Sequence, residues 1–235
     1  TIRQIIEITH AANTPGKYKL YTNDWQLNSA GGVEFFEDLQ SGSCRPWVAL
    51  ERREITLGAQ GKSRYRFEVT PPADAPDGEC RFVIMIEGET QDVKSQNINL
   101  PIAGRIGVIV YVAVGNAAPK LEVLGASSVP TVTATQAANH PAIEVRNSGG
   151  ATGRLSGFLS GTDASGKKFD FSPEGNPILP GTVRRIALVP TVPGGVAAAD
   201  SAAAAAVRVQ YPITIQGQLE WGSERVKFEQ RFAAP

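Results

Sequence analysis

Few residues in this sequence could carry chemistry. The only histidines, His10 and His140, stand far apart, and each lies beside an expected turn, so both are expected as surface or turn residues. No cysteine pair has metal-ligand spacing, no glycine-rich phosphate loop leads into a helix, and the acidic residues are scattered. The sequence therefore predicts a protein that is not an enzyme and that holds neither a metal nor a cofactor.

Cys44 and Cys80 are the only cysteines, and the chemistry expected of them is a disulfide. Cys44 precedes the strand expected at Trp47, Cys80 opens the next strand but one, and both should therefore lie at the same end of a sandwich. A bridge requires Cα atoms within about 7 Å, and closing a loop of about 36 residues contributes on the order of 3 to 4 kcal/mol in the chain-entropy model. A disulfide in an oxidising compartment is the favoured interpretation, and two free thiols are the alternative.

The elements that position these groups are short apolar clusters rich in Val, Ile, Tyr, Phe and Thr and closed by Gly, Pro, Asn or Asp, which is typical of strands joined by turns. The alternation in 64–69 predicts that Tyr65, Phe67 and Val69 face a core. Residues 106–114 are apolar on both faces, which predicts a central strand or one whose outer face is covered. The strand pattern stops at 116–119 and then resumes, so the sequence predicts an all-β protein.

The break in the strand pattern also predicts two domains, residues 1–117 and 118–235.

Composition excludes several partners. Lys plus Arg and Asp plus Glu number 23 each, so the net charge is zero, which argues against nucleic acid or an anionic membrane as partner. The longest apolar run, 106–114, is less than half of the roughly 20 residues that a membrane helix needs. Residues 1–9 show no signal-peptide pattern in this chain.

Six motifs in the sequence together carry a resemblance to a known family. They are Arg45-Pro46-Trp47-Val48-Ala49-Leu50, Arg64 to Pro72, Cys80-Arg81-Phe82, Arg105 to Val114, Ile143 to Ser148 and Ile178-Leu179-Pro180-Gly181. With these motifs the sequence resembles the periplasmic pilus-assembly chaperones and is identified as a divergent member. This resemblance implies two immunoglobulin-like β-sandwich domains in tandem, set in an L, with the first as the chaperone domain. It also implies a secreted protein of the periplasm that takes part in fimbria biogenesis.

Members of that family donate an edge strand to an incomplete subunit, which requires apolar residues at alternate positions. Ile98, Leu100 and Ile102 fit this pattern and are the expected subunit-binding residues, within one strand expected over 97–115. The alternative is that these three residues bury into the core of their own domain. The implied partners are pilin-type subunits and an outer-membrane usher, together with self-association through exposed strand edges.

Two departures from the family pattern concern its cationic anchor for the subunit's terminal carboxylate, which lies in the cleft between the domains. Gly107 stands where the family has a lysine, and the nearest cation is Arg105, on the same face, which is the expected substitute. Residues 2–9 resemble the family's second strand, so its first strand and the arginine on it have no match here. The alternative function is a structural or adhesive surface protein of two immunoglobulin-like modules without chaperone activity. The subunit and the oligomeric state are left open.

Overall fold

The computed structural model describes residues 1–28, 31–95, 98–132, 137–191 and 208–233 of the 235-residue chain; within strands, 91–95, 98–102, 131–132 and 137–138 are described by their backbone alone. The chain folds into two compact units, Thr1–Gly115 and Asn116–Pro235. The sequence predicted the boundary after residue 117, which is two residues beyond the boundary in the structure. Each unit is described below by itself.

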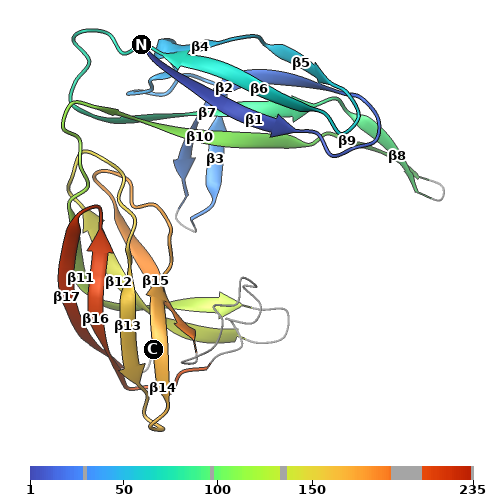
Figure 1. Ribbon diagram of the computed structural model, residues 1–235. Coiled ribbons are helices and arrows are strands. Elements are labelled where there is room, and N and C mark those ends of the chain that lie inside the picture. Colours follow the sequence, from blue (N-terminus) through green and yellow to red (C-terminus); the bar gives the residue numbers. More distant parts are fainter. Residues whose placement is uncertain (29–30, 96–97, 133–136, 192–207, 234–235) are drawn as a thin grey trace. The chain divides into compact units, whose positions relative to one another are not determined.

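Strands make up most of the first unit (Figure 1). Its only regular helical segment among the described residues is the 3₁₀ turn η1 (Arg45–Trp47). The strands are β1 (Ile2–Thr9), β2 (Gly16–Leu27), β3 (Val33–Phe36), β4 (Val48–Leu50), β5 (Glu54–Leu57), β6 (Lys62–Val69), β7 (Gly78–Gly88), β8 (Gln91–Ser95), β9 (Ile98–Ile102) and β10 (Arg105–Val114).

Two sheets of the first unit form a sandwich. One has the order β1-β6-β4, and the other has the order β10-β7-β2-β3, with β5 also paired to β2. The alternation predicted for 64–69 is confirmed, since Tyr65, Phe67 and Val69 of β6 are buried. They pack against residues of the opposite sheet such as Leu20 and Phe82. Period-two alternation therefore builds this core, as in other antiparallel sandwiches.

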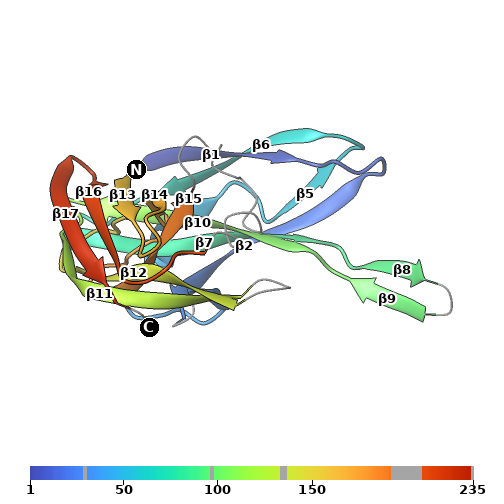
Figure 2. The same cartoon turned by 90° about the horizontal axis from the view of Figure 1, so that it is seen from below.

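The prediction of a single strand over 97–115 was wrong in its extent. The segment forms two strands, β9 and β10, separated by Ala103 and Gly104. A matching interruption at residues 89–90 separates β7 from β8, and the Gly88 amide bonds to the Gly104 carbonyl at 2.9 Å between them. Irregularities of this kind leave residues unpaired and bend a ladder without ending it. The β8–β9 hairpin consequently continues from the ends of β7 and β10 (Figures 1 and 2).

For residues 106–114 the sequence predicted either a central strand or a strand with a covered outer face, and the structure favours the second. Among the described strands, β10 pairs only with β7, so it is an edge strand rather than a central one. Its even-numbered residues from Val108 onward face the sandwich core, where Val112 is buried and Val108 and Val110 are partly buried, whereas Ile106 is 67 % exposed. Its odd-numbered residues lie on the outer face, and side chains from β3 reach over that face.

The second unit is a sandwich made from one folded sheet in the order β11-β12-β15-β14-β13-β16-β17. β15 pairs with β12 through residues 183–187 and with β14 through residues 188–191, so this strand passes from one layer to the other. The strands are β11 (Leu121–Val132), β12 (Ala137–Asn147), β13 (Ser156–Thr162), β14 (Lys168–Pro173), β15 (Val183–Thr191), β16 (Ile213–Trp221) and β17 (Glu224–Phe232).

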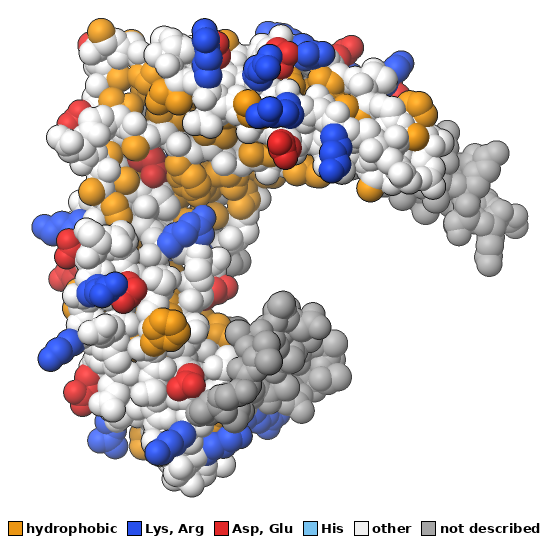
Figure 3. Space-filling model, in the orientation of Figure 1, with side chains coloured by type: hydrophobic (Ala, Val, Ile, Leu, Met, Phe, Trp, Pro, Cys, Tyr) orange, Lys and Arg blue, Asp and Glu red, His pale blue; other side chains and the backbone are white. Residues whose placement is uncertain are grey.

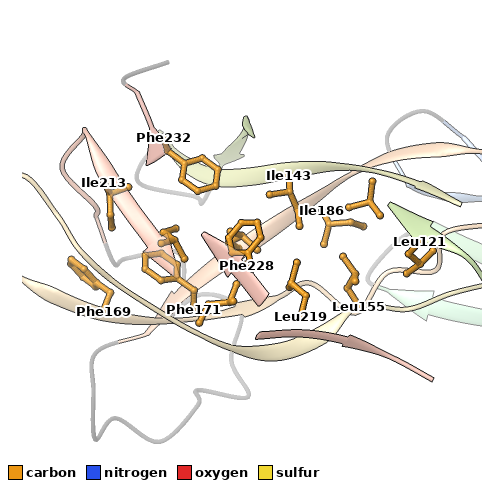
Figure 4. Close-up of a cluster of buried hydrophobic side chains, with 14 of the residues drawn as sticks. Leu121, Ile143, Leu155, Phe169, Phe171, Ile186, Ile213, Leu219, Phe228 and Phe232 are labelled. Carbon is orange, nitrogen blue, oxygen red and sulfur yellow. The ribbon is translucent and has the colours of Figure 1, made fainter. Parts of the chain in front are cut away.

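The core of the second unit lies between these layers (Figure 4). Ile143 from β12 and Ile186 from β15 meet aromatic residues of β14 and β17, among them Phe171 and Phe228. Both units are therefore β-sandwiches, and the predicted fold class is confirmed. No described helix is long and apolar enough to cross a bilayer.

The expectation that both histidines are surface or turn residues was wrong. His140 lies inside β12 and is 4 % exposed, while His10 follows β1 and is 8 % exposed. His10 is buried because its two ring nitrogens have partners, the Thr14 carbonyl at 2.6 Å and the Tyr18 hydroxyl. Buried polar groups are tolerated when they are hydrogen-bonded in this way. His140 differs, because its Nε2 has no partner within the described residues.

Candidate functional site

The candidate binding strand β9 is paired on one side. Its partner is β8, in a separate two-stranded sheet, and no other described strand pairs with it. The arm formed by β8 and β9 extends beyond the rest of the first unit in both ribbon views (Figures 1 and 2). A strand with a free flank presents unpaired backbone N–H and C=O groups, which can pair with a strand from another chain.

The register of the arm places its residues on two faces. Leu100 lies opposite Val93, Ile102 opposite Gln91, and Ile98 opposite Ser95. Residues directly opposite each other in an antiparallel pair lie on the same side of the sheet, so one side of the arm carries Ile98, Leu100, Ile102 and Val93. Sequence reasoning missed the contribution of Val93, because a single apolar residue in a polar segment gives no alternating pattern.

Arg105, the expected carboxylate partner, is exposed at the start of β10 and has acidic and phenolic neighbours. It pairs in register with Glu87 of β7. The Tyr21 hydroxyl donates a hydrogen bond to Glu87 at 2.6 Å. Burial and the Glu87 carboxylate raise the pKa of the Tyr21 phenol, while Arg105 opposes that rise. Glu87 and Arg105 therefore both act on the Tyr21 hydroxyl.

Gly107 occupies a position where a side chain would be tightly packed against its neighbours. A Cβ atom there would lie 3.0 Å from Phe35 Cζ, 3.0 Å from Val83 Cγ2 and 3.3 Å from Met85 Sδ. These distances are shorter than ordinary van der Waals contact between carbon atoms. Phe35 of β3 thus takes up the space that the expected lysine would need, which gives a physical reason for glycine at this position.

A small apolar cluster covers the outer face of the larger sheet. Val83 and Met85 of β7 are fully buried although they point away from the sandwich core. Trp25 of β2 packs edge-on against Tyr111 of β10 with ring centroids 5.7 Å apart, and the Arg81 guanidinium lies 5.6 Å from the centroid of Trp25. Sequence reasoning missed this cluster. Only the apolar character of both faces of 106–114 pointed to it.

The predicted disulfide between Cys44 and Cys80 is present, with the two Cα atoms 5.7 Å apart. Cys44 precedes η1, and Cys80 lies near the start of β7. The adjacent Arg45 fixes this segment to β2: it donates hydrogen bonds to the Thr22 carbonyl at 2.6 Å and the Glu37 carbonyl at 2.8 Å, and its guanidinium lies 3.5 Å from the Asp24 carboxylate. The disulfide therefore joins the connection before β4 to the larger sheet.

Charge is distributed evenly over the face shown in Figure 3, where basic and acidic side chains are interspersed on each unit. Many described ion pairs are exposed, such as Arg3 with Glu68 at 2.6 Å. Exposed pairs of this kind contribute little to stability or to recognition. This face therefore carries no field of one sign.

No family model and no curated protein matches the chain. Solved structures do match it. It is similar to a chain of the structure "Chaperone-tip adhesin complex is vital for synergistic activation of CFA/I fimbriae biogenesis", with a TM-score of 0.52 and 10 % identity over 99 % of this chain and 93 % of that one. At this identity the likeness shows a shared fold, which the sequence resemblance predicted.

Two further solved structures are similar at lower scores. The Pseudomonas aeruginosa CupB2 chaperone matches with a TM-score of 0.48 and 8 % identity, over 98 % of this chain and 93 % of that one. The CsuC–CsuE chaperone–tip adhesion subunit pre-assembly complex of Acinetobacter baumannii contains a chain that matches with a TM-score of 0.42 and 12 % identity, over 97 % of this chain and 90 % of that one.

Proposed function

We propose that this chain is a non-enzymatic periplasmic chaperone that caps incomplete β-rich surface subunits by donating β9 as a strand. The observation that carries this proposal is the one-sided pairing of β9, which has β8 on one flank and no other partner among the described strands. Ile98, Leu100 and Ile102 give this strand apolar residues at i, i+2 and i+4. Side chains at this spacing can fill the groove that a missing strand leaves.

Donation would proceed by strand addition. The free flank of β9 pairs with an edge strand of the subunit, and the apolar residues of β9 enter the subunit's open groove. Each Ile or Leu side chain that becomes fully buried contributes roughly 1.5 to 3 kcal/mol. A two-stranded hairpin is only marginally stable in water, and a third strand stabilises it. The arm and the subunit would therefore stabilise each other on binding.

Arg105 is the proposed contact for a terminal carboxylate of the subunit. It lies three residues beyond the end of β9, and it is paired in register with Glu87 of β7. The acidic residue opposite Arg105 disfavours a second carboxylate there. The apolar residues of β9 therefore supply most of the affinity in this proposal.

The proposed partners are pilin-type subunits, with an outer-membrane usher receiving the complex. The fold shared with a chain from a chaperone–tip adhesin complex supports this class of partner. The disulfide supports the periplasm as the compartment, because disulfides persist in oxidising environments.

The test uses a pilin-type subunit from the same gene neighbourhood, with the segment that would complete its own sandwich deleted. Refolded with this chain, the subunit should remain soluble in a one-to-one complex. Ile102→Asp should abolish complex formation, because it places a charge in an apolar groove. Asn99→Asp introduces the same side chain on the other face of the same strand and should leave binding intact.

A structural or adhesive protein of two sandwich modules predicts a different outcome. Such a protein would neither prevent aggregation of the strand-deleted subunit nor distinguish Ile102→Asp from Asn99→Asp. Equal behaviour of both variants, with normal folding of each, would exclude strand donation by β9 and would favour this alternative.

A further inference from the structure

A cavity of about 310 Å³ lies beside the disulfide of the first unit. Its wall includes Trp47, Val114, Cys80 of the bridge, and the acidic residues Asp77 and Glu79. The cavity falls at the small end of the range observed for ligand sites. It is large enough to admit a small thiol or the tip of a peptide loop.

The two cysteines of the bridge differ in exposure. Cys44 is 0 % exposed and belongs to the buried core around Phe67 and Phe82. Cys80 is partly exposed and lines the cavity, whereas Cys44 does not. Thiol–disulfide exchange depends on which sulfur an incoming thiolate can reach. Of the two cysteines, Cys80 is the one on the cavity side.

We propose that this cavity is a docking site for a thiol–disulfide exchange partner and that Cys80 is the sulfur at which exchange takes place. The partner is a protein dithiol, or its oxidised form, whose reactive loop is neutral or positively charged. The proposal concerns formation and opening of the bridge and is independent of strand donation by β9.

The exchange step conserves atoms and electrons. An incoming thiolate attacks the Cys80 sulfur, a new bond forms between the two sulfurs, and the bond between Cys80 and Cys44 breaks. Its electron pair leaves on Cys44 as a thiolate, which takes a proton from water. The second thiol of the partner then attacks the mixed disulfide at its own first sulfur, which releases reduced Cys80 and an oxidised partner. The reverse sequence forms the bridge.

The charge of the cavity wall determines which thiols react quickly. Glu79 lies 3.6 Å from the Arg81 guanidinium, so its charge is partly balanced. The Asp77 carboxylate lies against Gly115, and no ion pair is found for it among the described residues. A negative charge beside the reacting sulfur repels an anionic thiol and attracts a cationic one. This gives roughly a two- to fourfold difference in rate for one charge at contact distance in water.

The first test maps the mixed disulfide in the folded chain. The oxidised protein is exposed briefly to cysteamine, quenched with acid and alkylated with iodoacetamide, and its peptides are analysed by mass spectrometry. The proposal requires the cysteamine adduct on Cys80 and the alkyl group on Cys44. Adducts on Cys44, or in equal amounts on both residues, would overturn it, because exchange would then occur from an unfolded state or by another route.

The second test addresses the charge of the wall. Rates corrected for thiolate fraction should be higher for cysteamine than for the anionic 2-mercaptoethanesulfonate, and the ratio should fall at high salt. Asp77→Asn should raise the rate with the anionic thiol roughly two- to fourfold. Asp74→Asn, an exposed carboxylate in the same segment but outside the cavity wall, is the matched control and should have no effect. Equal rates for both thiols in the wild-type chain would contradict docking at this wall.

Discussion

Phe35 of β3 lies over Gly107 of β10, with its Cζ atom 3.0 Å from the position that a Cβ at residue 107 would take. These residues are far apart in the sequence, and the contact closes the apolar cluster on the outer face of the larger sheet. The contact makes a side chain at residue 107 tight against Phe35, and the nearest cation on this strand is Arg105.

Gly107→Lys should destabilise the first unit by about 1 to 3 kcal/mol, because the new side chain must displace Phe35 from a packed position. Chemical denaturation in urea measures the change in the free energy of unfolding. Gly104→Lys is the matched control, since nothing lies within 4 Å of a Cβ at residue 104. If Gly107→Lys is as stable as Gly104→Lys, Phe35 does not hold the position that we describe.

Phe35→Ala should relieve the clash when it is combined with Gly107→Lys. The double variant should then be more stable than the sum of the two single changes predicts, by about 0.5 to 3 kcal/mol, as expected for residues in contact. Additive effects of the two substitutions would show that they are not coupled.

Glu87→Gln should strengthen the binding of a subunit strand that ends in a free carboxylate, because it removes an acidic residue that is paired in register with Arg105. Arg105→Gln should weaken the same binding. Each effect should be roughly two- to fivefold for a solvent-exposed pair, measured by isothermal titration. A peptide with an amidated end is the control. If the amidated peptide responds equally to both substitutions, Arg105 does not contact a carboxylate.

Reduction of the Cys44–Cys80 bridge should lower the free energy of unfolding of the first unit by about 3 to 4 kcal/mol in the chain-entropy model. Urea denaturation with and without dithiothreitol, followed by probes specific to each unit, measures this loss. The second unit contains no cysteine and provides an internal control. An unchanged transition of the first unit on reduction would contradict the stabilising role of the bridge.

His140 should make the second unit less stable in mild acid. Burial lowers the pKa of its imidazole below the ordinary value of 6.5, and the Glu174 carboxylate only partly opposes this. The unfolded chain therefore binds a proton on His140 at a higher pH than the folded chain does. Stability is fully present above pH 6.5 and falls as the pH drops towards the lowered folded-state pKa.

Comparison with His140→Phe isolates this effect. The difference in unfolding free energy between the variant and the wild type should shift in favour of the variant between about pH 7.5 and about pH 5.5. A difference that does not change over this range would show that His140 has the same proton affinity in the folded and unfolded states.

The residues that sequence reasoning placed correctly are those whose environment is set locally. Tyr65, Phe67 and Val69 alternate along one strand, and their burial follows from that alternation alone. The Cys44–Cys80 bridge was predictable because both residues precede strands that start at the same end of a sandwich. Local pattern and strand direction are sufficient in these cases.

The features that were missed depend on pairing and packing that leave no alternating apolar pattern along the chain. The residues of β8 are polar apart from Val93, so this strand has no apolar signal, and its pairing with β9 forms it. The burial of His10 depends on Tyr18 and the Thr14 carbonyl, and the packing at Gly107 depends on Phe35. None of these contacts has a local signature in a single sequence.

Residue-resolved hydrogen exchange of the complex with a strand-deleted subunit is the most direct measurement of strand donation. We predict that the β9 amides that point away from β8 become protected on binding, while protection of β8 changes little. Binding that leaves the exchange rates of these outward-pointing β9 amides unchanged, with protection appearing elsewhere on the chain, would contradict the proposed pairing.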